Sequence, residues 1–350
     1  MDVENNKWFD PLFLVIKGMQ DKQMEVLEFI KMISDMGMKS TGGLSNNSNG
    51  MPKHIRPIMD SALVAMAMMI VGCGGSDKKD AAKGNDKKIT VGFSVSTQNN
   101  PFFVSLAKGV EAKAKELGVT VKVVDAQNDP AKQANDIADL LQQNISVLLV
   151  NPVDSDAIST SVKAANKANI PVICLDRSAN QGTVACLVAS DNVKGGEMAA
   201  DYIVKKLGEK VKVAELEGIP GASAARERGE GFHKIADSKL TVVAKQTAEF
   251  DRSKGLTVAE NMLQANPDIK AIFAQNDEMA LGAIEAAKSA GKQIFIVGFD
   301  GTADGVKAVE SGAMSATIAQ QPEVMGQQGL EVAAKAAKGE KVDAKISAPL

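Results

Sequence analysis

The 350-residue chain is poor in the side chains that most enzyme and metal sites need. It has two histidines, three cysteines, one tyrosine and one tryptophan, and aromatic residues make up 4% of its composition. Three cysteines cannot build a disulfide framework, and their spacing does not match that of a metal site. The scarcity of histidine argues against a histidine-dependent hydrolase and against a zinc enzyme.

Charge and glycine patterns exclude further classes of function. Lys and Arg number 40 against 43 Asp and Glu, a formal net charge of −3, so no broad basic surface for nucleic acid is expected. The phosphate-binding motif GxxxxGK[ST] does not occur, and the glycines of 218–231 and 298–305 do not form GxGxxG after a strand. We therefore expect the protein to use no cofactor and no metal ion.

The first 50 residues are predicted to be an atypical N-terminal extension. They contain apolar residues at helical spacing near 20–38, and they end in the Gly- and Asn-rich stretch 41–50, which is typical of a flexible linker. The extension has no basic helix-turn-helix pattern. A partner-binding helix at 20–38 is the alternative to a segment without function.

Residues 51–73 are predicted to be a lipoprotein-type signal segment. Basic residues follow Met51, and an apolar run of eleven residues occupies 61–71, too short to cross a bilayer but typical of a secretory signal. The tetrapeptide ending in Cys73 resembles a bacterial lipobox, in which the cysteine is lipidated. The alternative is a buried helix with an unmodified cysteine. Residues 74–87 lack apolar periodicity and are predicted to be a flexible linker.

From Ile89 onwards, strand-like and helix-like runs alternate. Strands are predicted at 89–95, 119–124, 146–150, 171–175, 184–189, 211–216, 240–245, 270–274, 293–298 and 315–319. Helices are predicted at 101–117, 130–143, 155–168, 193–207, 222–236, 252–264, 278–290, 303–310 and 323–337. This alternation indicates an α/β fold with parallel sheets covered on both faces, and about ten strands favour two sheets.

Three residue pairs predict where helices start. Asn100-Pro101, Asp129-Pro130 and Gln321-Pro322 each place a capping residue before a proline at a helix start.

Cys174 and Cys186 lie in apolar strand-like runs, so we expect them to be buried free thiols rather than a bond between neighbouring strands.

Polar side chains recur where the predicted strands end. They are Asn151, Asp176, Arg177, Asn276, Asp277, Asp300 and Gln320. Open α/β sheets bind small ligands at this edge. Carboxylates, amides and guanidinium groups suit the hydroxyls of a sugar, while the adjacent rings of Phe102 and Phe103 suit its C–H faces. For any single residue a helix cap or a solvated turn is the commoner role, but their recurrence at one edge favours a sugar site.

Longer motifs connect the chain to a known family. They are STQNNPFF (96–103), NPVDSDA (151–157), LDR (175–177), ASDN (189–192), ASAARERGEGF (222–232), FDRSKGL (250–256), FAQNDEMALGA (273–283), VGFDGT (297–302) and ATIAQ (316–320). Through these motifs the chain, from about Lys88 to its C-terminus, resembles the ribose-binding receptors of ABC importers, which are type I periplasmic binding proteins.

The resemblance implies two Rossmann-like lobes with parallel sheets, joined by a hinge. Lobe 1 would comprise 88–190 and 321–347, and lobe 2 would comprise 191–320 and 348–350. Members of the family normally have a final strand that crosses back between the lobes, whereas this chain stops at Leu350. If that stop is native, closure should be less well constrained. Residues 1–50 have no counterpart in the family.

The resemblance also implies a function. The chain would bind D-ribose outside the cytoplasm by closing its lobes, and would deliver the sugar to the permease of an ABC importer without acting as an enzyme. It would be a monomer of the cell envelope that binds no nucleic acid, either attached to the membrane only through a lipid on Cys73 or free in the periplasm. The implied sugar site comprises Ser96, Asn100, Phe102, Phe103, Asn151, Asp176, Arg177, Arg228, Phe250, Asn276, Phe299, Asp300 and Gln320. Phe102 and Phe103 of lobe 1 would face Phe250 and Phe299 of lobe 2 across the sugar.

Three alternatives stay open. The same receptor class could bind allose, another aldose or a furanosyl signal molecule, because a fold does not name its ligand. A sugar-responsive transcription regulator shares this two-lobe fold, but it would need a DNA-binding motif that 1–50 lack. An enzyme acting on a sugar is the third, since Asp176 and Asp300 could form a carboxylate pair.

Overall fold

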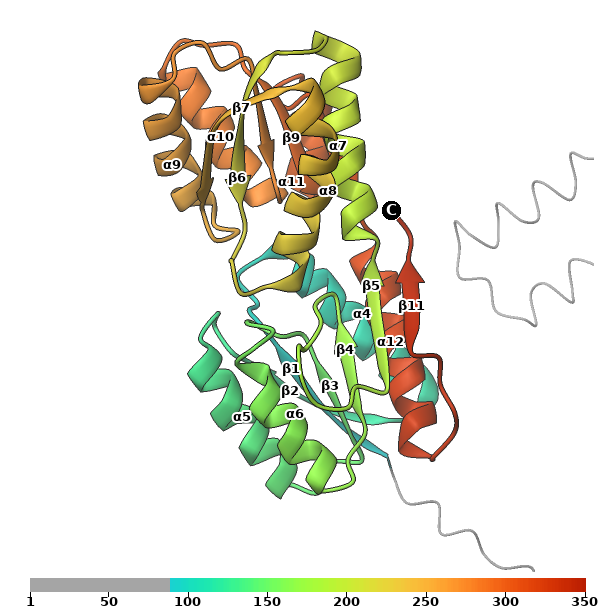
Figure 1. Cartoon of the computed structure of the whole chain (residues 1–350). Coiled ribbons are helices and arrows are strands. Elements are labelled where there is room, and N and C mark those ends of the chain that lie inside the picture. The colour runs from blue at the N-terminus through green and yellow to red at the C-terminus, as the bar shows by residue number, and fades with distance from the viewer. Residues whose placement is uncertain (1–88) are drawn as a thin grey trace, which may run out of the picture. The chain divides into compact units, whose positions relative to one another are not determined.

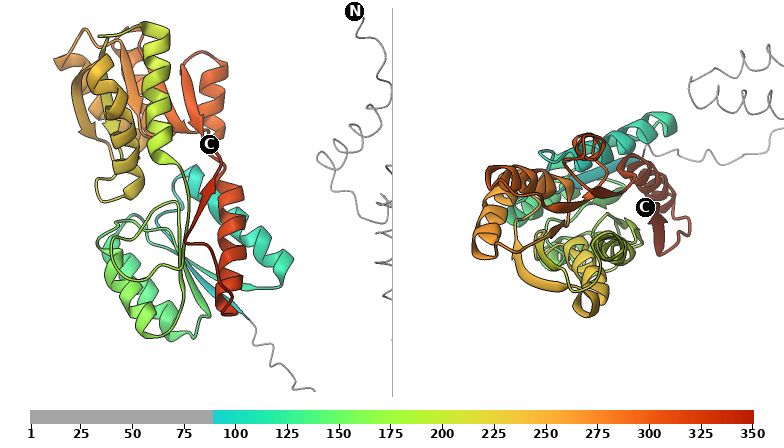
Figure 2. Two further views of the ribbon diagram at one scale, coloured as in Figure 1. Left: turned by 45° about the vertical axis from the view of Figure 1, so that its right-hand side comes forward. Right: turned by 90° about the horizontal axis from the view of Figure 1, so that it is seen from above.

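The computed structural model of the chain describes residues 89–350, which form two α/β lobes, each built on its own parallel sheet (Figure 1). The predicted extension, the signal segment with Cys73 and the linker lie outside the described residues. Figure 2 shows the two lobes from the side and from above.

The first lobe contains a six-stranded sheet in the order β11-β5-β4-β3-β1-β2, with every pairing parallel. Its strands are β1 (Thr90–Val95), β2 (Thr120–Asp125), β3 (Val147–Val150), β4 (Val172–Leu175), β5 (Cys186–Ser190) and β11 (Lys345–Ala348). The helices α4 (Pro101–Leu117) and α12 (Pro322–Ala337) cover one face, while α5 (Pro130–Gln142) and α6 (Ile158–Lys167) cover the other.

The second lobe contains a five-stranded sheet in the order β10-β9-β8-β6-β7, also parallel throughout. Its strands are β6 (Lys212–Glu217), β7 (Thr241–Thr247), β8 (Ala271–Ala274), β9 (Phe295–Asp300) and β10 (Ala316–Ala319). The helices α7 (Asn192–Leu207) and α8 (Ser223–Lys239) cover one face, and α9 (Arg252–Ala265), α10 (Asp277–Ser289) and α11 (Ala303–Glu310) cover the other.

The two-sheet α/β prediction is confirmed, and each predicted strand and helix is present within three residues of its expected bounds. The sequence pattern missed β11, a four-residue strand at the edge of the first sheet. Edge strands keep one side in solvent, and Lys345 and Ser347 are exposed here, so no apolar run marks this strand.

Two of the three predicted caps form. The side chains of Asn100 and Asp129 accept hydrogen bonds from backbone N–H groups of the first turns of α4 and α5. Within the described part of the chain, Gln321 makes no such bond at the start of α12, although Pro322 occupies the first turn as predicted. The longer glutamine side chain does not favour the short return to the backbone that Asn and Asp make.

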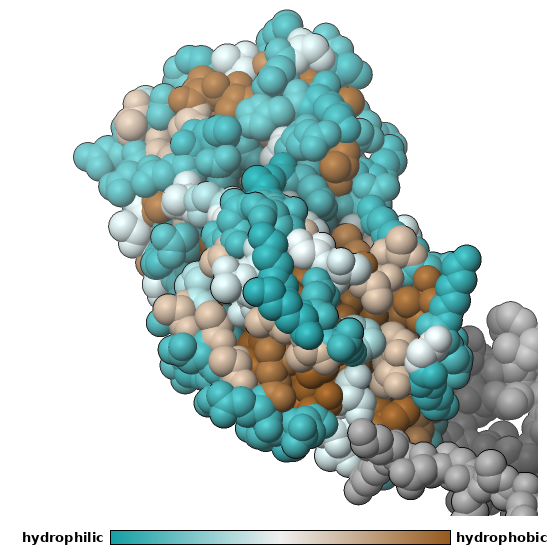
Figure 3. Space-filling model, turned by 60° about the horizontal axis from the view of Figure 1, so that its bottom comes forward, coloured by the Kyte–Doolittle hydropathy of each residue, from teal (hydrophilic) through white to brown (hydrophobic). Residues whose placement is uncertain are grey.

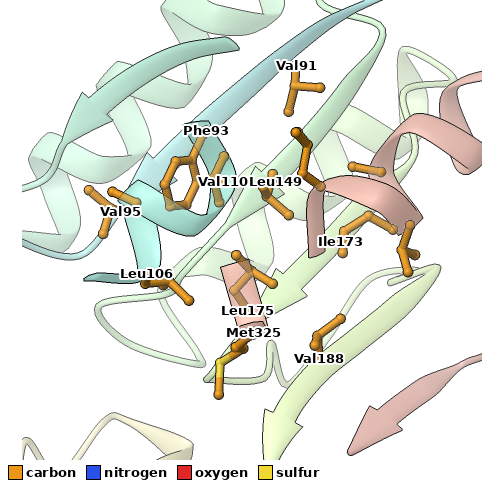
Figure 4. Close-up of a cluster of buried hydrophobic side chains, with 14 of the residues drawn as sticks. Val91, Phe93, Val95, Leu106, Val110, Leu149, Ile173, Leu175, Val188 and Met325 are labelled. Carbon is orange, nitrogen blue, oxygen red and sulfur yellow. The ribbon is translucent and has the colours of Figure 1, made fainter. Parts of the chain in front are cut away.

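The core of the first lobe shows why β1 organises that half of the fold. Val91, Phe93 and Val95 alternate along β1 and point to the same side, where they pack with residues of β3, β4, β5, α4 and α12 (Figure 4). All three are fully buried. Burying such a side chain contributes about 1.5–3 kcal/mol, so this row fixes the register of the strand whose end leads into the α4 cap.

The two cysteines of the described chain are free and buried, as predicted. Cys174 pairs with Leu187 and Ile173 with Cys186 across β4 and β5. Because successive side chains of a strand point to opposite faces, Cys174 belongs to the core under α5 and α6, and Cys186 to the core under α4 and α12. The two sulfur atoms therefore lie on opposite faces of the sheet, and burial raises the pKa of the Cys174 thiol to about 12.

Few large hydrophobic side chains are exposed among residues 89–350. They are Val104 and Leu117 on α4, Met198 and Leu207 on α7, Val306 on α11, and Leu350. The face drawn in Figure 3 accordingly shows hydrophobic patches separated by hydrophilic residues. Across residues 89–350, the helices all fall short of the length and hydrophobicity that crossing a membrane requires.

One partly buried ion pair anchors α8 to the sheet of the second lobe. The Nε2 atom of His233 lies 2.9 Å from Oε2 of Glu215, a fully buried carboxylate on β6, and its Nδ1 atom lies 2.6 Å from Oδ1 of Asp237. The hydrogen bond to Glu215 is the main cause that raises the pKa of His233 to about 9, and burial opposes it. His233 is therefore an imidazolium at neutral pH.

We predict that this pair stabilises the second lobe in a pH-dependent way. The pKa of His233 is about 9 in the folded protein, above its ordinary value of 6.5, so its contribution is fully present below about pH 6.5 and is lost as the pH rises through 9. In urea unfolding, the wild-type chain should exceed His233→Gln in stability at pH 6, and the gap should narrow towards pH 10. Lys234→Gln, at the exposed neighbouring position, should show no such trend. A gap for His233→Gln that stays constant with pH would contradict the prediction.

Candidate functional site

A small cavity lies between the two lobes, where the carboxyl ends of both sheets meet. Its walls are formed by Asn100, Phe102, Phe103, Asp176, Arg177, Ala224, Arg228, Phe250, Asn276 and Asp300. The first five belong to the start of α4 and the end of β4, and the last five to the second lobe. Both lobes therefore present strand ends and helix starts to one shared space, the place where open α/β sheets bind ligands.

The structure brings together nine of the thirteen residues predicted from the sequence. Ser96, Asn151, Phe299 and Gln320 do not line the cavity and lie behind its wall. Ala224 is the one wall residue that the sequence did not indicate. An alanine offers no recognisable binding chemistry, so only its place in the first turn of α8 could have marked it.

The two lobes are in direct contact beside this cavity. The backbone N–H of Ser178 donates to Oγ of Ser223 at 2.9 Å, and the N–H of Ser155 donates to the carbonyl of Gly221, also at 2.9 Å. Ser155 and Ser178 belong to the first lobe, whereas Gly221 and Ser223 precede or begin α8 of the second. The chain is therefore in a closed arrangement, with the wall residues of both lobes facing one another.

Aromatic rings from both lobes line the cavity: Phe102 and Phe103 from the first lobe and Phe250 from the second. The rings of Phe102 and Phe103 are perpendicular, with centroids 5.2 Å apart. The guanidinium carbon of Arg177 lies 5.0 Å from the centroid of Phe103 and 5.3 Å from that of Phe250. A cation thus bridges rings of opposite lobes.

Phe299 has a different place. Its ring is fully buried in the core under α7 and α8, and the guanidinium carbon of Arg228 lies 3.8 Å from its centroid. Phe299 therefore supports an arginine of the wall instead of forming the wall itself.

Four charged side chains are buried at the cavity. Arg177 Nε lies 3.5 Å from Asp176 Oδ2, and Arg228 Nη1 lies 3.6 Å from Asp300 Oδ1. Burial raises the pKa of Asp176, and that of Asp300 well above its ordinary value, although the arginines counteract this. Burial also lowers the pKa of Arg177 to about 10. Burial keeps these charged side chains away from water, so a ligand that hydrogen-bonds to them is favoured.

Several polar atoms at this site lack a hydrogen-bond partner among the described residues. Those in the cavity wall are the acceptor Asp176 Oδ1 and the donor Arg177 Nε, whereas Gln320 Oε1 lies behind the wall. A buried polar group left unpaired costs about 1–3 kcal/mol. An apolar ligand would leave these atoms unpaired, whereas hydroxyl groups both donate and accept. The arrangement is therefore suited to a small polyhydroxylated ligand.

The backbone is strained at three wall residues. Asp176 has φ 63°, Phe250 has φ 61° and Asp300 has φ 117°, all in the region that residues with a Cβ rarely adopt. Each such conformation costs on the order of 1–3 kcal/mol and persists only where the surrounding structure holds it. The ring of Phe250 packs directly on Gly218, where a Cβ atom would collide with it.

A second layer of polar residues holds the strand ends of the first lobe together. Asn151 Oδ1 accepts from the N–H of Ser96 at 3.2 Å, and its Nδ2 donates to the carbonyl of Leu175 at 3.0 Å. Gln133 donates to the carbonyl of Asn151 at 3.0 Å and accepts from the N–H of Val153 at 2.9 Å. Sequence reasoning missed Gln133 because it lies on α5, away from any strand end.

The strand ends of the second lobe are held in the same way. Gln320 Nε2 donates to Asp300 Oδ1 at 2.9 Å. Gln275, fully enclosed after β8, accepts from the N–H of Gly218 and donates to the buried carboxylate of Glu215. Gln275 directly follows a strand, so the strand-end signal could have found it. Within residues 89–350, no group of three His, Cys, Asp or Glu side chains could hold a metal ion.

Comparison with known proteins agrees with this geometry. A family model described as periplasmic binding protein domain matches residues 91–341. The ribose import binding protein RbsB of Bacillus subtilis (strain 168) is 60% identical over 272 residues, which cover 78% of this chain and 89% of that protein. The protein of the same name from Escherichia coli (strain K12) is 56% identical over 265 residues, covering 75% and 90%.

Solved structures agree as well. An ABC transporter solute binding protein from Bacillus halodurans C-125 with bound myo-inositol superposes with a TM-score of 0.72 and 30% identity. The match covers 76% of this chain and 94% of that one. With two parallel-sheet lobes closed on a polar cavity, and with these matches over most of its length, the chain belongs to the periplasmic binding proteins of type I.

Proposed function

We propose that the chain is the extracytoplasmic receptor of an ABC importer and that it binds D-ribose in the cavity between its lobes. The observation that carries this proposal is the set of buried, unpaired polar atoms beside aromatic rings contributed by both lobes. Such a set fits a small sugar and not an apolar ligand. The choice of ribose is supported by the identities of 60% and 56% to proteins named as ribose import binding proteins.

The proposed site would recognise the sugar by its two kinds of surface. The rings of Phe102 and Phe250 would pack on the C–H faces, one from each lobe. Asp176, Arg177 and Asp300 would hydrogen-bond the hydroxyls. Because these groups are buried, a sugar that lacks a hydroxyl, or holds it at another angle, would leave one of them unpaired.

Binding would also favour closure. The sugar would contact both walls at once only when the lobes are shut, so it would bind the closed form more tightly and shift the population towards it. The closed form is the one that would be presented to the permease, which we propose as the protein partner. We propose that the receptor itself is a monomer.

A second candidate is the same kind of receptor with another ligand. The solved structure with bound myo-inositol shares the fold at 30% identity, so the lobes accommodate different polyols in different relatives. Allose, another aldose or a furanosyl signal molecule would each meet the same buried polar groups. A thermal-shift comparison of pentoses and hexoses separates these ligands from ribose.

The membrane attachment is a further part of the proposal. The lipobox-like tetrapeptide ending in Cys73 would place a lipid anchor before the linker at 74–87, so that the lobes stay near the membrane without entering it. The relatives above are named as import binding proteins, in line with a receptor that releases its sugar unchanged.

We predict that Asp300→Ala weakens ribose binding by about 2–5 kcal/mol, or about thirtyfold or more, in calorimetry. The substitution removes a hydroxyl acceptor and leaves Arg228 without the carboxylate at 3.6 Å. Asp268→Ala, at a carboxylate 73% exposed in the same lobe, should bind ribose like the wild type. An unchanged affinity in Asp300→Ala would contradict the proposed site, and ribose failing to rank first in the thermal-shift panel would favour the second candidate.

We predict that the mature protein begins at a lipidated Cys73. The mass of the detergent-extracted protein, expressed in a bacterium that processes lipoproteins, should equal the chain from Cys73 to the C-terminus plus its acyl groups. Cys73→Ser should carry no acyl mass. A membrane-released protein that retains residues before Cys73, or carries no lipid, would refute the anchor but not the sugar site.

A further inference from the structure

Arg228 contacts four residues in addition to Asp300, and the most distant is Phe250, whose ring centroid lies 5.8 Å from its guanidinium carbon. Its Nε–H donates to Oδ1 of Asn192 at 2.9 Å, and its Nη1 donates to the carbonyl of Gln275 at 2.6 Å. Its guanidinium carbon lies 3.8 Å from the centroid of Phe299. Two directed hydrogen bonds and one stacked ring fix the plane of a rigid guanidinium and leave Nη2 for another partner.

Asn192 does not line the cavity, yet it is almost fully buried beside it. It is the first residue of α7, immediately after the chain crosses from the first lobe into the second at Asp191. Its Oδ1 faces the Arg228 donor, and its Nδ2 donates to Oε2 of Glu227 at 3.1 Å. Because one end of the amide meets a donor and the other an acceptor, both contacts favour the same orientation of the amide.

The neighbours of Arg228 all belong to the second lobe. Asn192 lies on α7, Gln275 follows β8 and Phe299 lies on β9, while Arg228 itself is on α8. Their mutual geometry therefore does not depend on lobe closure.

Arg177, the other arginine of the wall, is placed differently. Its Nη1 donates to the carbonyl of Pro152 in the first lobe, but its guanidinium lies between Phe103 and Phe250, and Phe250 belongs to the second lobe. Its full set of contacts forms only when the lobes meet. The two arginines thus have unequal roles. The contacts of Arg228 come from the second lobe alone, whereas Arg177 gains its contact with Phe250 only when the lobes close.

We propose that Asn192 is a positioning residue that fixes Arg228 in its ligand-binding geometry before the lobes close. A gain in ribose affinity from this positioning rests on the proposed function, whereas the positioning of Arg228 itself does not. A guanidinium already locked in place loses little side-chain freedom when the sugar arrives, which strengthens binding.

The first test uses the sugar-free protein. The Nε–H proton of Arg228 is observed by ¹H–¹⁵N NMR, and its signal is assigned by its loss in Arg228→Lys. We expect Asn192→Ala to speed the hydrogen exchange of this Nε–H at least tenfold. Asn192→Asp, made together with Glu227→Gln so that its second carboxylate oxygen faces an amide donor, keeps an oxygen acceptor for Nε–H and should restore much of the protection.

Matched controls separate this effect from general loosening of the lobe. Glu227→Gln keeps an acceptor for Nδ2 of Asn192 and should leave the Arg228 signal unchanged, and backbone exchange in β8 and β9 should stay as in the wild type. Exchange of the Arg228 Nε–H that is unaffected by Asn192→Ala would overturn the proposal. Should Asn192→Ala fail to fold, Asn192→Ser, whose hydroxyl is too short to reach Nε, carries the same test.

The second test is a double-mutant cycle on ribose affinity. We expect Asn192→Ala to weaken binding about tenfold in the wild-type background, and by less than twofold when Arg228 is already replaced by Lys, which has no Nε–H. An equal loss in both backgrounds would show that Asn192 acts on folding and not through Arg228. If the unsubstituted chain bound no ribose, the proposed function would fail, and the exchange measurement would still decide the role of Asn192.

Discussion

The structure depends on holding two arginines and two aspartates out of water where the lobes meet. Isolated charges at this depth would be strongly unfavourable, so each must keep close partners. Arg177 lies between Phe103 and Phe250, Arg228 rests on Phe299, and Asp300 accepts from Gln320. The strained backbones of Asp176 and Asp300 and the polar residues behind them serve the same purpose, because they hold these buried charges beside their partners.

The two lobes contribute to this site in different ways. The second lobe carries Arg228 together with its hydrogen-bond partners Asn192 and Gln275 and the ring of Phe299. The first lobe contributes Phe102 and Arg177, whose environment is complete only when Phe250 arrives from the other side. A ligand that touches both walls therefore stabilises the closed form, which is the physical basis of a receptor that signals occupancy by its shape.

Much of this could be predicted from the sequence because its signals are local. Buried parallel strands such as β3 and β4 are continuous apolar runs, and the Asn100-Pro101 pair marks the start of α4 without reference to the rest of the fold. The strand-end rule placed Asp176 and Asp300 at one edge, and the structure places both on the same cavity.

What the sequence could not supply depends on distant contacts. Alternation along β9 does not reveal that the ring of Phe299 lies under Arg228 and not on the wall, since that is decided by α7 and α8. Gln133 lies outside the quoted motifs, and the motif that ends in Asn192 does not reveal its partner, because their roles come from residues 18 and 36 positions away. The edge strand β11 lacks an apolar run since half of its side chains face solvent.

The most direct measurement of the central claim is a crystal structure of the chain grown with D-ribose. We predict one sugar in the cavity between the lobes, with its ring between Phe102 and Phe250 and its hydroxyls on Asp176, Arg177 and Asp300. A sugar bound elsewhere, or a closed cavity that holds only water at saturating ribose, would contradict it.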